Sequence, residues 1–120
     1  MAYKVTINAD HLYVQYLGDI DPLDIINITA DPEMIVPLQK VGAVIYDFSG
    51  ARSVNIDIDE MSEIAVLSDL DTPAVARPKG IVIPIDINDT IRIEGLKQAL
   101  KRMKWEIYFV ANHKEALGLL

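Results

Sequence analysis

The chain has 120 residues, of which 51% are hydrophobic, so one domain over residues 1–120 with a buried core is expected and a disordered regulator is excluded. It has no cysteine, which excludes a disulfide framework, a zinc–thiolate site and thiol catalysis and suits a cytoplasmic protein. The formal net charge of −7 argues against nucleic-acid binding. Charges or prolines interrupt the longer apolar runs, so we expect no signal peptide and no membrane span.

The first two predicted elements are strands joined as a hairpin. YKVTI and LYVQY, at residues 3–7 and 12–16, each alternate apolar and polar side chains, which is the period of a half-buried strand. Gly18 and Asp19 are expected to end the second strand. Three prolines within residues 21–40 permit only short helical pieces there.

Three later apolar runs predict further strands. They are AVIYDF at residues 43–48, IVIPI at residues 81–85 and WEIYFV at residues 105–110. The continuous apolar run at residues 43–48 favours a central strand that is covered on both faces, and Tyr46 and Phe48 are expected in the core. Pro84 lacks a backbone donor and is expected at a bulge or at the end of its strand.

Helical patterns separate these runs. One helix is expected over residues 59–70, and a second follows a cap at residues 86–90. The buried face of the second is expected to consist of Ile93, Leu96, Leu100 and Met103. Asn112 and Glu115 resemble a capping box for a last helix. Its inward side chains are expected to be Ala116, Leu117 and Leu120.

Strands that alternate with helices after a hairpin indicate parallel pairing with right-handed crossovers. We therefore predict an α/β fold, with a mixed, mostly parallel sheet of about five strands and helices packed on it. Residues 44–48, 81–85 and 106–110 are expected to be adjacent strands.

Three aspartates follow predicted strands, namely Asp19, Asp47 and Asp86. Ligands of open α/β sheets collect at the carboxyl ends of strands, so three converging carboxylates there would suit Mg²⁺. The alternative is that each aspartate accepts backbone N–H bonds where a strand turns into a loop, and this alternative is favoured. No metal and no cofactor is therefore predicted, and Ser49 lacks the G-x-S-x-G context of a catalytic serine.

A basic segment contrasts with the acidic chain. Residues 92–104 hold five basic residues and one acidic residue, a local charge of +4. Lys97, Lys101 and Lys104 are expected on its exposed side, as a docking face for an acidic partner or an anionic membrane surface. The acidic residues 57–71 of a second copy would be one such partner, giving a homodimer. The alternative is a solvated outer face.

With these elements placed, the chain resembles the STAS family (sulfate transporter and anti-sigma-factor antagonist domains), and within it the small stand-alone SpoIIAA-like branch. YKVTIN and LYVQYLGDID resemble the family's opening hairpin, and AVIYDFSGA resembles the strand that ends there in Asp-Leu-Ser-Gly. WEIYFVANHKEALGLL resembles the family's last strand and helix. The resemblance covers nearly the whole chain and implies the SpoIIAA-like fold.

The resemblance also implies where a phosphorylated serine would stand. In the anti-sigma-factor antagonists, a serine in Asp-Ser-Ser-Gly is phosphorylated by a partner kinase. The matching positions here are Asn55, Ile56, Asp57 and Ile58, which offer no hydroxyl. The phosphoserine switch is therefore expected to be absent, with Asp57 near the place of the phosphoserine.

Three functions follow in order of preference. The first is a non-catalytic regulatory or protein-interaction module, whose partner is another protein or a second copy. The second is a carrier of a small apolar ligand or lipid. The resemblance implies this function because related folds in the wider superfamily bind such ligands between helix and sheet. The third is an enzyme that uses the strand-end aspartates. A filled core beside an exposed basic helix would favour the first, and a large apolar cavity the second.

Overall fold

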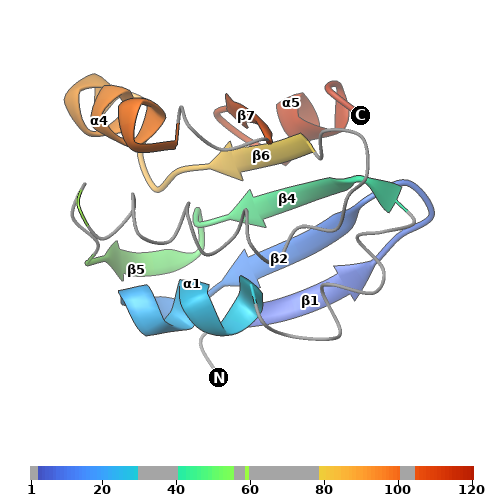
Figure 1. The fold of residues 1–120 in the computed structure, drawn as a ribbon, viewed down its shortest axis with the longest axis horizontal. Helices are drawn as coiled ribbons and strands as arrows, with labels where there is room; N and C mark the ends of the chain where they lie inside the picture. The colour runs from blue at the N-terminus through green and yellow to red at the C-terminus, as the bar shows by residue number, and fades with distance from the viewer. Residues whose placement is uncertain (1–2, 30–40, 56–58, 60–78, 101–104) are drawn as a thin grey trace.

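The computed structural model describes residues 3–29, 41–55, 59, 79–100 and 105–120, and this part of the chain contains a five-stranded sheet of order β1-β2-β4-β6-β7 (Figure 1). The strands are β1 (Tyr3–Ile7), β2 (Leu12–Tyr16), β4 (Ala43–Asp47), β6 (Lys79–Ile83) and β7 (Glu106–Phe109). β1 and β2 are antiparallel, and the other neighbours are parallel. The predicted mostly parallel α/β sheet is confirmed, with β4 at its centre and β4, β6 and β7 adjacent.

A second, two-stranded sheet was not expected. The φ of Gly18 is +78°, a left-handed conformation that glycine adopts without steric cost, and it separates β2 from the next strand. That strand, β3 (Gly18–Ile20), pairs in parallel with β5 (Ala51–Val54). The prediction that the strand ends at Gly18 and Asp19 is therefore right for β2, but both residues belong to a new strand.

The helices begin at residues that satisfy free backbone N–H groups. In α1 (Pro22–Thr29), proline occupies the first helical position, where no N–H is needed. Asp21 and Asp24 each accept a hydrogen bond from the other's backbone N–H, at 3.1 and 2.9 Å. In α4 (Thr90–Leu100), the carboxylate of Asp89 accepts the N–H of Arg92 at 3.2 Å.

The third described helix is α5 (His113–Leu117), and its predicted cap is confirmed. The side chain of Asn112 accepts the N–H of Glu115 at 2.9 Å. The carboxylate of Glu115 reaches back to the N–H of Ala111 at 3.0 Å, one residue before the cap.

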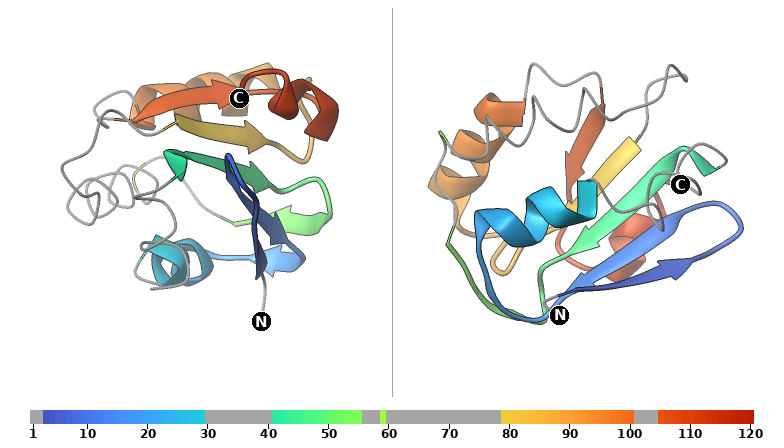
Figure 2. Two further views of the ribbon diagram at one scale, coloured as in Figure 1. Left: turned by 90° about the vertical axis from the view of Figure 1, so that its right-hand side faces the viewer. Right: turned by 60° about the horizontal axis from the view of Figure 1, so that its bottom comes forward.

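Each face of the large sheet has its own apolar core, and α1 and α5 lie on opposite faces (Figure 2). The core on the α1 face contains Leu12, Val14, Tyr16, Ile20, Ile25, Val44, Ala51 and Trp105. The core on the α5 face contains Ile45, Ile81, Ile83, Val110 and Ala116. Successive residues of a strand point to opposite faces, which explains why Val44 and Ile45 belong to different cores.

Two predictions about side chains and strand ends need correction. Leu117 and Leu120 are 46% and 39% exposed, so Ala116 alone of the three predicted inward residues is fully buried. The reason is that α5 has only five residues, which is too short to turn a long apolar stripe inward. The strand predicted at residues 81–85 begins at Lys79 and ends at Ile83. Pro84, which has no backbone N–H to donate, therefore lies just after the end of the strand. Met103 and residues 60–70 lie outside the described residues.

Candidate functional site

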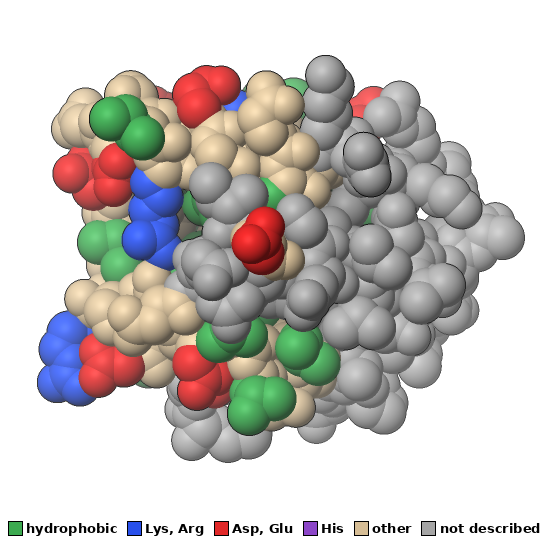
Figure 3. All heavy atoms as spheres, turned by 60° about the vertical axis from the view of Figure 1, so that its left-hand side comes forward, with side chains coloured by type: hydrophobic (Ala, Val, Ile, Leu, Met, Phe, Trp, Pro, Cys, Tyr) green, Lys and Arg blue, Asp and Glu red, His purple; other side chains and the backbone are tan. Residues whose placement is uncertain are grey.

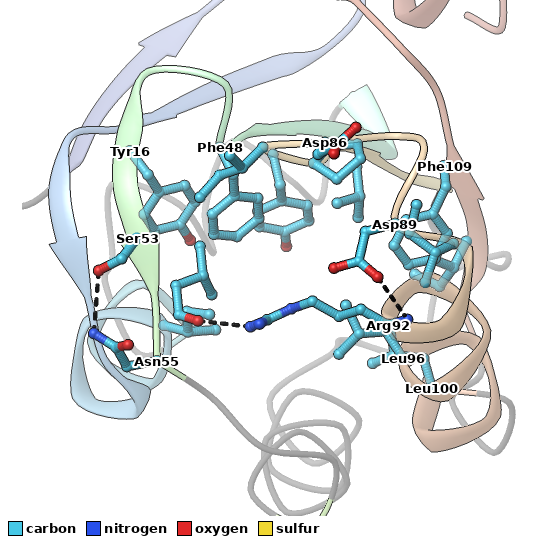
Figure 4. Close-up of a pocket in the computed structure, with 18 of the residues that line it drawn as sticks. Tyr16, Phe48, Ser53, Asn55, Asp86, Asp89, Arg92, Leu96, Leu100 and Phe109 are labelled. Atoms are coloured by element: carbon cyan, nitrogen blue, oxygen red, sulfur yellow. Dashed lines mark hydrogen bonds between the residues drawn. The ribbon is translucent and has the colours of Figure 1, made fainter.

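A pocket of about 400 Å³ lies on the α1 face of the sheet (Figure 4). Part of its wall is a row of side chains from adjacent strands. Tyr46 on β4 pairs with Val82 on β6, and Val82 pairs with Phe109 on β7. Because residues paired in parallel strands point to the same face, the register alone aligns these side chains along the pocket.

Helix α4 supplies the opposite wall. Ile93, Leu96 and Leu100 line the pocket, and their spacing of three and four residues places them on one face of the helix. Ile93 is buried and the other two are half-buried, so the predicted apolar face of this helix is confirmed for its described members. Ile25 of α1 and Trp105, before β7, also contribute to the lining.

Polar groups surround the mouth of the pocket. The guanidinium of Arg92 donates a hydrogen bond of 2.6 Å to the carbonyl oxygen of Val54, which joins α4 to the end of β5 (Figure 4). Asp86, Asp89 and Asn55 also line the pocket and are exposed. The mouth therefore combines charges of both signs with an amide, whereas the interior is apolar.

Tyr16 places an unusual polar group in this apolar setting. Its ring stacks on that of Phe48, with centroids 4.3 Å apart and planes within 4°. The residue is fully buried, and within the described part of the chain its hydroxyl has no hydrogen-bond partner. Burial raises the pKa of Tyr16 well above its ordinary value, with smaller contributions from Tyr46 and Tyr3. Tyr16 is therefore a residue of the pocket wall whose phenol is neutral and, within the described residues, has no hydrogen-bond partner.

Sequence reasoning assigned Tyr46 and Phe48 to the core, and the structure gives them a second role. Both are half-buried and pack against the core of the α1 face, yet both line the pocket. Burial raises the pKa of Tyr46 above its ordinary value as well. The sequence held one signal for such a site, namely aromatic residues at alternate positions of a central strand, but the same signal is typical of an ordinary core.

Asp47 lies on the other face of the sheet, away from the pocket. Its carboxylate accepts hydrogen bonds from the hydroxyl of Tyr13, from the hydroxyl of Ser49 at 2.5 Å and from the backbone N–H of Ser49 at 2.9 Å. Burial raises the pKa of Tyr13 to about 12, and the hydrogen bond to Asp47 adds to the rise. Asp47 thus holds the exit of β4 in place.

The other two predicted carboxylates have local partners too. Asp19 on β3 forms an ion pair with Arg52 of β5 and accepts the hydroxyl of Ser53 at 2.7 Å, and the Arg52 hydrogen bond lowers the pKa of Asp19 to about 2. Asp86 accepts the N–H of Asn88 at 2.9 Å, which closes the turn before α4. Among the described residues, no three Asp, Glu or His side chains come together as a metal site.

The remaining predicted site residues are only partly described. Asn55 directly follows β5, donates from its side chain to the hydroxyl of Ser53 at 3.2 Å, and is exposed. Residues 56–58 lie outside the described residues. Lys97 is exposed on α4, 3.5 Å from a carboxylate oxygen of Glu94 and 5.9 Å from the ring centroid of Phe109. Lys101 and Lys104 also lie outside the described residues.

Charged and apolar side chains are mixed on the side of the molecule that carries α4 and the end of β5 (Figure 3). Ile91, in the first turn of α4, is 87% exposed, and Ile85 in the preceding loop is also exposed. Among the described helices, none is both long and apolar enough to cross a bilayer. This end of the molecule thus offers exposed apolar groups beside Arg92 and Lys97.

Solved structures share this fold. The anti-sigma factor antagonist SpoIIAA in its unphosphorylated form is similar with a TM-score of 0.59 and 15% identity, over 98% of this chain and 96% of that chain. The phosphorylated form of the Bacillus cell fate determinant SpoIIAA gives a TM-score of 0.57 and 14% identity, over 98% of both chains.

A third similar structure is an uncharacterised protein of the DUF3478 family from Shewanella loihica, which has a SpoIIAA-like fold. Its TM-score is 0.58 and its identity 13%, over 99% of this chain and 92% of that chain. No protein-family model matches the chain, and no curated protein sequence matches it. The three structural similarities show that the chain has the SpoIIAA-like fold, as its sequence indicated.

Proposed function

We propose that this chain is a non-catalytic regulatory module that acts as a single domain in the cytoplasm by binding a protein partner. The observation that supports the proposal is the likeness of fold to an anti-sigma factor antagonist over 98% of the chain. As an antagonist of an anti-sigma factor, that protein acts on another protein. A partner-binding role for this chain extends the likeness from fold to mode of action.

The contact surface in this proposal is the end of the molecule where β5 meets α4. The hydrogen bond from Arg92 to Val54 ties these two elements together, so they form one continuous surface. Ile91 supplies an exposed apolar contact, and Lys97 supplies a positive charge in an otherwise acidic chain. Interfaces commonly combine a small apolar centre with a charged rim that affects association rate and specificity.

The non-catalytic part of the proposal rests on how the strand-end aspartates are used. Both carboxylate oxygens of Asp47 accept hydrogen bonds from Tyr13 and Ser49. A carboxylate held in this way stabilises the loop after its strand and has little capacity left for a substrate. Asp19, ion-paired with Arg52, has a structural role of the same kind.

A charge-reversal pair tests the proposed surface. The chain is used as bait in an extract of the organism that encodes it, and bound proteins are quantified by mass spectrometry. Lys97→Glu should reduce capture of the partner at least severalfold and weaken its salt dependence, because a rim charge is inverted. Lys114→Glu, the same change at an exposed position on α5, should leave capture unchanged. If both variants and the unchanged chain capture the partner equally, the proposed contact surface is contradicted. If the captured partner is a second copy of the chain, the result supports a homodimer.

The pocket supports a second function, the binding of a small apolar ligand. Pockets of roughly 300–1,000 Å³ that are lined mainly by apolar and aromatic groups are typical of small-molecule sites. The pocket here, at about 400 Å³, falls in that range. Saturable binding of a neutral fluorescent probe would support this function, and failure of every probe to bind would remove it.

A further inference from the structure

The pocket contains a hydrogen-bond donor that the described part of the chain leaves unused. The hydroxyl of Tyr16 is fully buried and unpartnered in those residues, and Tyr16 lines the pocket. We propose that the pocket binds a neutral, largely apolar molecule whose oxygen acceptor receives the hydrogen bond of Tyr16. This inference rests on the second proposed function and specifies the chemical class of its ligand.

A buried hydroxyl without a hydrogen-bond partner lowers the stability of the fold. Phenylalanine would fill the same space without that cost. The stacking of Tyr16 on Phe48 needs only the ring, not the hydroxyl. Because the hydroxyl has no accessible surface in the ligand-free chain, a ligand's acceptor would reach it, and satisfy the donor, once the side chains that cover it shift aside.

The distribution of charge in the pocket favours a neutral ligand. Among the described residues of the lining, the charged ones are Asp86, Asp89 and Arg92, all of them exposed at the mouth. Two acids and one base give the described part of this rim no excess of positive charge to attract an anion. Near Tyr16 the lining is apolar, with Phe48, Ile25 and the neutral Tyr46, so a carboxylate placed there would lose its hydration without gaining a counter-ion.

The acceptor that fits is therefore a carbonyl, ether or alcohol oxygen on an apolar body. A ketone or ester accepts one hydrogen bond from the phenol and needs no counter-ion. The apolar body would contact Val82, Phe109 and Leu96 on the facing walls. A more polar end of the same molecule could remain at the mouth beside Asn55 and Arg92 (Figure 4).

A fluorescence titration with prodan, a neutral naphthalene ketone, tests the proposal at neutral pH. Binding to the unchanged chain should be saturable, and 2-decanone should displace the probe at concentrations at least about tenfold lower than decanoate. Tyr16→Phe should weaken prodan binding about five- to tenfold, the effect of one hydrogen bond. Tyr13→Phe, the same change on the same strand but on the other face, should leave binding unchanged.

Stability of the ligand-free variants provides a second readout. Tyr16→Phe should keep or raise the urea midpoint, because it removes an unsatisfied buried hydroxyl and retains the ring. Val82→Phe, which fills the pocket, should weaken prodan binding more than tenfold. Saturable prodan binding that Tyr16→Phe leaves unchanged, or a lower urea midpoint for that variant, overturns the proposal while the ligand-binding function stands. If prodan does not bind saturably to the unchanged chain, both the Tyr16 proposal and the proposed ligand-binding function are overturned.

Discussion

The hydroxyl of Tyr13, on β2, donates a hydrogen bond to the carboxylate of Asp47 at the end of β4, on the face of the sheet opposite the pocket. The two residues are 34 positions apart in the chain, so this bond fastens the exit of the central strand to its neighbour. The ring of Tyr13 also lies against that of His113 in α5, at a centroid distance of 4.7 Å. One side chain thus connects two strands and a helix.

Tyr13→Phe should therefore destabilise the fold by about 1–2 kcal/mol, because it leaves a buried carboxylate with one donor fewer. The pKa of Tyr13 is raised from 10.0 to about 12, so this contribution to stability is complete below pH 10 and is lost as the pH rises towards 12. Urea unfolding at neutral pH and at alkaline pH measures both effects. A difference between the unchanged chain and the variant that does not shrink above pH 10 contradicts the assignment.

The ion pair of Asp19 with Arg52 predicts a pH dependence in the acid range. The pKa of Asp19 is lowered from 3.8 to about 2, chiefly by the hydrogen bond from Arg52. Its contribution to stability is therefore present above pH 3.8 and is lost as the pH falls towards 2. Arg52→Gln should raise the pKa of Asp19 towards its ordinary value, as a carboxyl NMR titration would measure. Both side chains are exposed, so the effect on overall stability should be small.

Exposed isoleucines allow a matched test of the partner surface. Ile91, on α4, is 87% exposed, and Ile7, at the end of β1, is 60% exposed. Ile91→Thr and Ile7→Thr should each change stability by only about 0.5 kcal/mol, because neither side chain is buried. Partner affinity, measured by calorimetry, should fall at least severalfold for Ile91→Thr alone. Equal losses in both variants would point to a non-specific effect of surface hydrophobicity.

The sequence predicts that residues 55–58 carry no kinase-dependent switch, because none of the four has a hydroxyl. After incubation with ATP and cell extract, the intact mass should show no stable phosphate in this segment. A phosphate mapped to Asp57 would contradict the prediction. Phosphorylation at Ser53 or Ser62 would instead move a switch to a neighbouring position.

The sheet could be predicted because its strands have clear patterns. Continuous apolar runs gave β4, β6 and β7 as adjacent strands with β4 at the centre of the sheet, and alternation in residues 3–7 and 12–16 gave the hairpin. The strand boundaries do not follow from the apolar pattern alone, since Lys79 and Gly80 join β6 although neither has the apolar character of the run that follows.

The second sheet and the pocket were beyond sequence reasoning for different reasons. Strand β3 has three residues, too few to show a period, and it depends on the left-handed turn at Gly18. The pocket depends on how far α4 stands from Tyr46, Val82 and Phe109. A sequence shows that such side chains are apolar, but not whether they contact one another or border an open space.

The most direct test of the account is the footprint of the protein partner, measured by amide hydrogen exchange of the chain alone and in its purified complex. If the partner binds where β5 meets α4, exchange should slow in residues 51–55 and 90–100 and remain unchanged in α5, residues 113–117. Protection confined to α5 or to the outer edge of β1 would contradict the account, as would the failure of any partner to form a complex.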